Sequence, residues 1–267
     1  MKVTFDFYDI LQNHIAAFIL VLTRSTGIFL LSPFFGSLNI PIMFRALAAV
    51  SFTFVLFPTI NDTNLVELPS TILMYLAMIV EEMFVGWLIG FVAFVAFAAI
   101  NLAGKVMDMQ VGFAIVNVMD PTSGQQIPLI GSFLYNLAVM IFLISNGHHM
   151  IIAALAESFK LIPLLGVHWS EPFISLIIDI TAGIFTTGMK IAMPVTFAIL
   201  MTNVGLGILA RTMPQMNIFV VGIPMHIMIG IFMLSIVAPF YVLFLDVVFD
   251  AMYGNISLAI REIAPVP

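Results

Sequence analysis

The sequence has few charged residues and no cysteine. Only 8% of its 267 residues are Asp, Glu, Lys or Arg, whereas a soluble domain has about 25%. With eight Lys and Arg in all, the chain lacks the basic patch that a nucleic-acid-binding protein needs. The absence of cysteine excludes disulfides, thiolate nucleophiles and cysteine-ligated metals. These absences argue against an ordinary soluble enzyme, a disordered chain and a nucleic-acid binder.

Apolar residues dominate what is present. Hydrophobic residues make up 62% of the chain, and the mean hydropathy is +1.19. A soluble protein of this size cannot hide so much apolar surface, because much of any such domain faces solvent. The composition therefore predicts an integral membrane protein.

Six stretches of the chain are apolar and long enough, or nearly long enough, to cross a membrane as helices. A helix needs about 20 apolar residues to cross a hydrocarbon core of about 30 Å. None of the six alternates strictly between apolar and polar residues, which argues against a transmembrane barrel. Helices satisfy their own backbone groups in lipid, so we expect an all-α fold. The stretches are residues 15–35, 46–60, 83–102, 127–144, 180–210 and 227–245.

The distribution of positive charge does not orient these segments. If all six span the membrane, three cations fall on each side, so the positive-inside rule gives no answer. A tie can arise by chance from so few charges, or because the helices are not independent spans that face lipid. One side would hold Lys2, Lys160 and Arg261, and the other Arg45, Lys105 and Arg211.

Two charged residues lie well inside apolar segments. Arg24 and Lys190 would each cost at least about 2.5–3.5 kcal/mol at mid-bilayer unless paired or turned toward protein or water. One interpretation is an ion or proton path. The other is a contact between helices, in which Arg24 or Lys190 meets Glu81, Glu82 or Asp179. Because neighbouring positions on a helix point in different directions, we expect only one of Glu81 and Glu82 to face such a partner.

A GxxxG motif in the third apolar stretch also points to helix packing. Gly86 and Gly90 are four residues apart, so they leave one side of a helix without side chains. This spacing lets two helix backbones approach closely.

The region between the third and fourth stretches contains a short apolar run. Residues 111–119 are too few to span a bilayer, and a strong turn signal, Asp120-Pro-Thr-Ser-Gly, follows them. Short apolar segments at membrane depth are tolerated where they are buried in protein or line a cavity. The run therefore predicts either a plug or re-entrant loop, or a buried connector.

No pattern in the sequence is typical of catalysis. There is no P-loop, no Ser/His/Asp set, no paired catalytic carboxylates and no metal-binding motif. We therefore expect no enzymatic activity, no cofactor and no metal. A small-molecule secondary transporter is the alternative, with Lys190 or Arg24 as a coupling site near Pro194. Such a transporter predicts internal repeats, and the sequence shows none.

Short motifs spread over nearly the whole chain carry a family resemblance. They are Arg24-x-x-Gly27-x-Phe29, Pro33-Phe-Phe-Gly36, Ile40-Pro41, Arg45, Gln110-x-Gly112, Asp120-Pro-x-Ser-Gly-x-Gln-x-Pro128, Asn146-Gly-His148, Ser158-Phe159 with Pro163, Gly205-x-Gly207 and Arg211-x-x-Pro214-Gln-Met-Asn217-x-Phe219-x-x-Gly222-x-Pro224. As an ordered set they resemble FliR, a membrane subunit of the flagellar type III protein export gate. Injectisome export proteins belong to the same superfamily.

The resemblance implies a place in a larger helical assembly. FliR-like proteins join FliP-like and FliQ-like subunits, and an FlhB-like export protein acts with them. The resemblance divides this chain into a FliP-like part, about residues 1–172, and a FliQ-like helical hairpin, about residues 173–267. It implies a multi-pass protein of the bacterial inner (plasma) membrane at the flagellar basal body, in contact with lipid and with exported flagellar proteins.

The resemblance also assigns a role to the short apolar run. In the family, a loop of this subunit projects into the export pore and helps close it. The matching positions are Gly112, Phe113, Ala114, Ile115 and Val116. Gly112 would permit a backbone turn. Phe113, Ile115 and Val116 would form an apolar constriction that excludes water and ions from the closed pore.

Overall fold

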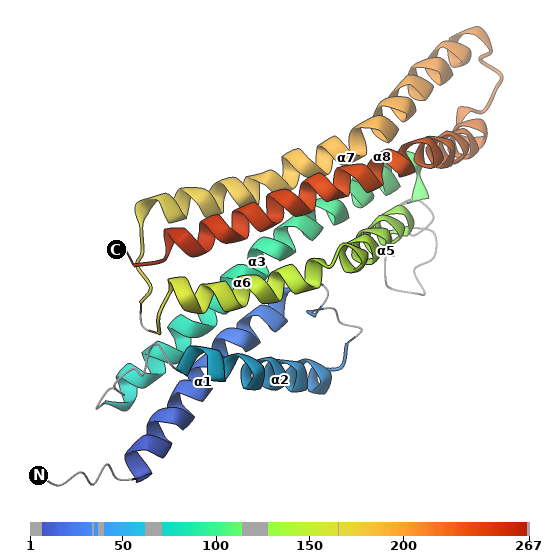
Figure 1. The fold of residues 1–267 in the computed structure, drawn as a ribbon. Helices are drawn as coiled ribbons and strands as arrows, with labels where there is room; N and C mark the ends of the chain where they lie inside the picture. The colour runs from blue at the N-terminus through green and yellow to red at the C-terminus, as the bar shows by residue number, and fades with distance from the viewer. Residues whose placement is uncertain are drawn as a thin grey trace, which may run out of the picture. The chain divides into compact units, whose positions relative to one another are not determined.

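The computed structural model describes residues 7–33, 35–36, 40–61, 71–113, 128–164 and 166–265. Over these residues the chain forms seven helices and no strand, so the predicted all-α fold is confirmed (Figure 1). The helices are α1 (Phe7–Leu31), α2 (Ile42–Asn61), α3 (Ile72–Val111), α5 (Leu129–Ile144), α6 (Gly147–Leu161), α7 (Glu171–Thr212) and α8 (Ile218–Glu262).

Among the described helices, α6 is the one that hydropathy did not indicate. It follows α5 after a two-residue break, and the axes of the two helices differ by 65°. The turn predicted by Asn146-Gly147 lies in this break, where Asn146 has a left-handed φ of 58°. Helix α6 carries two histidines, Glu157 and Lys160 among its 15 residues, so it lacks the continuous apolar run of the other six helices.

Three helices are far longer than the apolar stretches that predicted them. Helices α3, α7 and α8 contain 40, 42 and 45 residues. At a rise of about 1.5 Å per residue, each is about 60–68 Å long. A hydrocarbon core of about 30 Å accommodates only about 39 Å of helix, even at a tilt of about 40°. A part of each helix therefore lies outside the hydrocarbon core.

The chain is a multi-pass membrane protein by the length and composition of its helices. Within the described residues, four helices are long and apolar enough to cross a membrane, or up to five if α5 and α6 form one broken span. Helix α2 is apolar over Ile42–Pro58 but is shorter. The stretch within α8 has little cover from the chain itself, since only 11% of its most apolar window is buried. Its apolar side chains must therefore face lipid or another protein.

The chain divides into two compact units, and α3, α7 and α8 each contribute to both. Unit 1 comprises Met1–Phe94, Asn146–Ile180 and Ala251–Pro267. Unit 2 comprises Val95–Ser145 and Thr181–Asp250.

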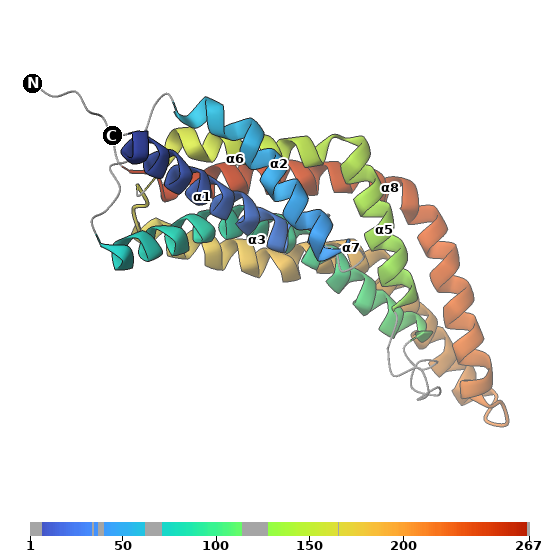
Figure 2. The ribbon, with the colours of Figure 1, turned by 90° about the horizontal axis from the view of Figure 1, so that it is seen from below.

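In unit 1, glycines bring α1 and α3 into direct backbone contact. A Cβ added at Gly86 would collide with the carbonyl oxygen of Arg24, and one added at Gly27 would lie 2.6 Å from the carbonyl oxygen of Met83. One turn further along α3, a Cβ at Gly90 would lie 3.1 Å from the carbonyl oxygen of Ile28. The GxxxG motif thus faces α1, which runs beside α3 (Figure 2). Helix α2 packs against α1 and α6.

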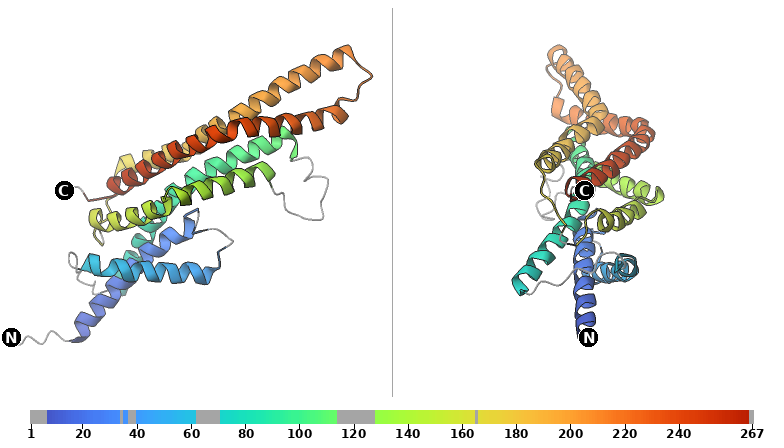
Figure 3. Two further views of the ribbon diagram at one scale, coloured as in Figure 1. Left: turned by 45° about the vertical axis from the view of Figure 1, so that its right-hand side comes forward. Right: turned by 60° about the vertical axis from the view of Figure 1, so that its left-hand side comes forward.

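Unit 2 is built on close contacts of α3 with its neighbours. A Cβ at Gly104 of α3 would collide with the backbone of Gly131 in α5, so these helices also touch through main chain. The rings of Phe97, Phe142 and Phe249 join α3, α5 and α8, with centroids 5.4–5.7 Å apart. Helices α7 and α8 run side by side and are connected by residues 213–217 (Figure 3).

We predict that Gly86→Ala lowers the thermal stability of the purified protein in detergent. The added methyl group would overlap the main chain of Arg24, and overpacking of this kind costs about 1–3 kcal/mol. Gly254→Ala is the matched control, because a Cβ at Gly254 in α8 would meet no atom within 4 Å. An equal loss of stability in both variants would show that the contact of α1 with α3 is not tight.

Candidate functional site

The guanidinium of Arg24 is the centre of a buried polar network in unit 1. Arg24 is on α1 and has no exposed surface, and Glu82 on α3 is 1% exposed. Arg24 Nε donates to Glu82 Oε2 at 2.6 Å, and Nη2 donates to Oε1 at 3.0 Å. This bidentate geometry is the strongest that an Arg–carboxylate pair adopts.

The remaining N–H groups of Arg24 reach α6 and the residue that follows it. Nη1 donates to Ser158 Oγ at 3.3 Å and to the carbonyl oxygen of Ile162 at 3.2 Å. Nη2 also donates to the Ile162 oxygen, at 3.2 Å. Ser158 in turn donates its hydroxyl hydrogen to Leu155 O at 2.7 Å. All five donors of the guanidinium therefore have acceptors.

The ring of Phe159 covers one face of this guanidinium. The Cζ atom of Arg24 lies 4.2 Å from the ring centroid. A cation–π contact in a desolvated site is worth about 2 kcal/mol. Since α1, α3 and α6 all contribute groups, the network holds three helices in one arrangement.

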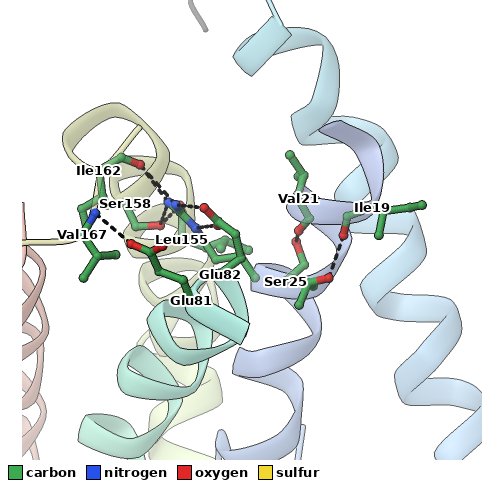
Figure 4. A network of polar contacts seen from close by, with 11 residues as sticks. Ile19, Val21, Ser25, Glu81, Glu82, Leu155, Ser158, Ile162 and Val167 are labelled. Carbon is green, nitrogen blue, oxygen red and sulfur yellow. Dashed lines mark hydrogen bonds and ion pairs between the residues drawn. The ribbon is translucent and has the colours of Figure 1, made fainter. Parts of the chain in front are cut away.

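Glu81, the neighbour of Glu82 on α3, makes a separate contact. Its Oε1 accepts the backbone N–H of Val167 at 3.2 Å, in the segment between α6 and α7 (Figure 4). The two neighbouring carboxylates thus serve different partners. Of the two cations considered in the sequence, Arg24 pairs with Glu82. Lys190 is exposed on α7 and has no ion pair within the described part of the chain.

The first two of the expected plug residues lie at the end of α3, in unit 2. Helix α3 ends at Val111, which is fully buried, and its side chain packs against Gly230 of α8. Gly112 follows with a φ of 96°, so the backbone turn expected there is present. Phe113 is half-buried. Ala114, Ile115 and Val116 lie outside the described residues.

Sequence reasoning missed Asp108, one turn before Gly112. Its side chain is 4% exposed. Oδ1 accepts the backbone N–H of Ile130 at 2.9 Å, and Oδ2 accepts that of Gly131 at 3.0 Å. Asp108 therefore caps the N-terminus of α5 from α3, where a negative charge is favoured. The sequence did contain a signal that α5 needs a cap from elsewhere. The residue before α5 is Pro128, whose side chain cannot form a capping hydrogen bond.

These contacts position helices relative to one another. Within the described ranges, no three His, Asp or Glu side chains come together to hold a metal ion. The arrangement joins helices at Arg24, at Glu81 and at Asp108. Its chemistry is that of charge burial and helix capping.

We predict that Glu82→Ala destabilises the protein by about 3–5 kcal/mol, because it leaves the buried charge of Arg24 without a counter-ion. The double variant Arg24→Met with Glu82→Met removes both charges and should recover much of this loss. Unfolding by heat or denaturant in detergent measures both effects.

Glu157→Ala serves as the control, since Glu157 is exposed on α6 and its loss should change stability by no more than about 0.5 kcal/mol. If the double variant were less stable than Glu82→Ala, the loss in Glu82→Ala could not be due to the unpaired buried charge of Arg24.

Comparison with known proteins identifies the family of this helical chain. Residues 15–252 match the family described as bacterial export proteins, family 1. The flagellar biosynthetic protein FliR of Bacillus subtilis is 34% identical over 226 residues, which cover 82% of this chain and 85% of that protein. FliR of Escherichia coli is 27% identical over 242 residues, covering 91% and 92%. FliR of Aquifex aeolicus is 31% identical over 209 residues, covering 78% and 79%.

The matched region includes the ion pair, the α5 cap and both glycine contacts. It extends from α1 into the last turns of α8, and so takes in both units. The region that matches the family therefore includes part or all of every helix that the structure describes. This chain belongs to the bacterial export proteins, family 1.

Proposed function

We propose that this chain is a non-enzymatic subunit of the flagellar type III protein export gate. It would help form and close the pore through which unfolded flagellar proteins leave the cell. The observation that carries the proposal is the similarity to flagellar biosynthetic proteins named FliR, over more than four fifths of the chain in two cases. Energy for export would come from other components, the proton motive force and a cytosolic ATPase.

The length of the helices supports a place in an assembly. Helices α3, α7 and α8 are about twice as long as a bilayer requires. Their apolar side chains continue beyond the hydrocarbon core, where water would otherwise meet them. FliP-like and FliQ-like subunits would supply the missing cover, an FlhB-like export protein would join them, and lipid would cover the rest.

The division of the chain follows the same proposal. Residues 1–172 would be the FliP-like part, and residues 173–267 the FliQ-like hairpin. Helices α7 and α8, which begin at Glu171 and end at Glu262, have the form expected of such a hairpin. The protein would lie in the bacterial inner membrane at the flagellar basal body.

The segment after α3 would be the plug of the pore. Gly112, Phe113, Ala114, Ile115 and Val116 are the proposed residues. Val111 is fully buried, and Gly112 has a left-handed backbone. These two features support a defined position for the residue at which the chain leaves α3. Asp108 strengthens this point, because it links the end of α3 to the start of α5.

A small-molecule secondary transporter is no longer a competing candidate. The relatives are flagellar biosynthetic proteins in an export family. Of its two proposed coupling residues, Arg24 is paired with Glu82. Lys190 is exposed, and no carboxylate within the described residues pairs with it.

We predict that the full-length chain, expressed with FliP-like and FliQ-like proteins from the same cell, purifies with them in one particle. Apolar surface on α8 that the chain leaves uncovered would drive this association. Mild detergent extraction, affinity capture and particle imaging measure it. Recovery of a stable, lipid-embedded monomer under these conditions would overturn the architecture.

We predict that deletion of residues 112–116 leaves the assembly intact and makes the membrane leaky to ions. Loss of the apolar constriction would let water and ions enter the closed pore. Membrane conductance and growth in high salt report the leak, and co-purification of the partner subunits verifies assembly. Unchanged conductance in a strain that assembles the complex would refute the plug assignment.

A further inference from the structure

In unit 2, an open groove lies between α7 and α8, near the turn that connects them. It has a volume of about 420 Å³, within the range of about 300–1,000 Å³ that is usual for small-molecule sites. Leu206 and Leu209 line it from α7, and Met225 and Ile229 line it from α8. Its wall is therefore almost wholly apolar.

Among the described residues that line the groove, none offers a free hydrogen-bonding side chain to an occupant. Thr202 has the only polar side chain of this set. The hydroxyl of Thr202 donates to the carbonyl oxygen of Ala198 at 2.8 Å, within α7. An occupant of the groove must therefore be held by apolar contact, as a hydrocarbon chain would be.

A glycine provides part of the space. Gly205 lines the groove, and a Cβ added there would meet no atom within 4 Å. A larger side chain at this position would thus enter the groove without displacing the helices. Gly207, two residues further on, is equally open but does not line the groove.

A single charge lies beside this apolar surface. Between residues 191 and 245 the only Asp, Glu, Lys or Arg is Arg211. Arg211 is exposed in the last turn of α7, three residues after Ile208, a groove residue on the same side of the helix. No carboxylate within the described residues pairs with it.

Among the described residues, no hydrogen bond or ion pair engages the guanidinium of Arg211. The last turn of α7 is held instead by Thr212, whose hydroxyl donates to the carbonyl oxygens of Ile208 at 3.3 Å and Leu209 at 3.0 Å. Leu209 O also accepts the backbone N–H of Met213 at 2.8 Å. The donors of Arg211 therefore remain available to an external anion.

We propose that this groove and Arg211 bind an anionic phospholipid. One acyl chain would lie between α7 and α8, and the guanidinium would donate to the phosphate. A phospholipid joins an apolar chain to a phosphate, which are the two features the site requires. Arginine binds phosphate through paired hydrogen bonds, and both helices belong to candidate membrane spans.

The test measures the lipids that co-purify with the full-length chain and its partner subunits in polymer-bounded nanodiscs. Mass spectrometry compares the ratio of phosphatidylglycerol and cardiolipin to phosphatidylethanolamine with the ratio in the whole membrane. We expect enrichment of the anionic lipids in the wild-type sample. Arg211→Gln should reduce the enrichment roughly tenfold, since it removes a charge-assisted contact to phosphate. Arg211→Lys should retain most of it.

Gly205→Leu should also abolish enrichment, because its side chain would fill the groove. Gly207→Leu makes the same change in size and helix propensity outside the groove, and Lys190→Gln removes another exposed cation of α7. Both controls should leave the enrichment unchanged.

Three results would overturn the proposal. The first is no enrichment of anionic lipid in the wild-type sample, and the second is an equal effect of Gly205→Leu and Gly207→Leu. The third is that a photo-cross-linker at Ile208 captures a protein subunit instead of lipid. The last result would assign the groove and Arg211 to a protein partner. The wild-type measurement stands even if a variant fails to fold. Export can be normal whatever the lipid result, so the proposed gate function is tested separately by the conductance of the deletion strain.

Discussion

The position of Arg24 constrains three helices of unit 1, namely α1, α3 and α6. Its charge is stable without solvent because each of its five N–H groups has an acceptor, on α3, on α6 or at Ile162. The main chain of the same residue is the surface on which Gly86 of α3 packs. Charge pairing and backbone contact therefore coincide at one point. Neither α3 nor α6 can slide along α1 without separating a buried cation from its acceptors.

In both units, glycines allow two helices to touch through their main chains. In unit 1 a glycine pair lets α1 meet α3, and in unit 2 Gly104 and Gly131 let α3 meet α5. A carboxylate accompanies each contact: Glu82 binds the guanidinium, and Asp108 binds two backbone N–H groups at the start of α5. Small residues remove the steric barrier, and the buried carboxylate fixes the register. Scarce charges are thus placed where they determine helix positions.

Hydropathy predicted the all-α fold and six of the seven helices that the structure describes. It predicted neither α6 nor the full length of α3, α7 and α8. An apolar run marks only the part of a helix without charge, and α3 continues through Glu81 and Lys105 because no residue there breaks it. The sequence offered several acidic partners for Arg24, and only the packing of α1 on α3 selects Glu82. Asp108 was missed because the N–H groups it caps are 22 and 23 residues away. The pore role of residues 112–116 remains a prediction from resemblance.

The separation of Arg24 from its acceptors along the chain bears on how the protein is made. Glu82 follows Arg24 by 58 residues, and Ile162 follows it by 138. During synthesis, α1 therefore reaches the membrane with an unneutralised cation, at a cost of about 2.5–3.5 kcal/mol. The arrival of α3 supplies the counter-ion, and the arrival of α6 completes the shell of acceptors. The full set of acceptors around Arg24 can therefore form only after α6 has been synthesised.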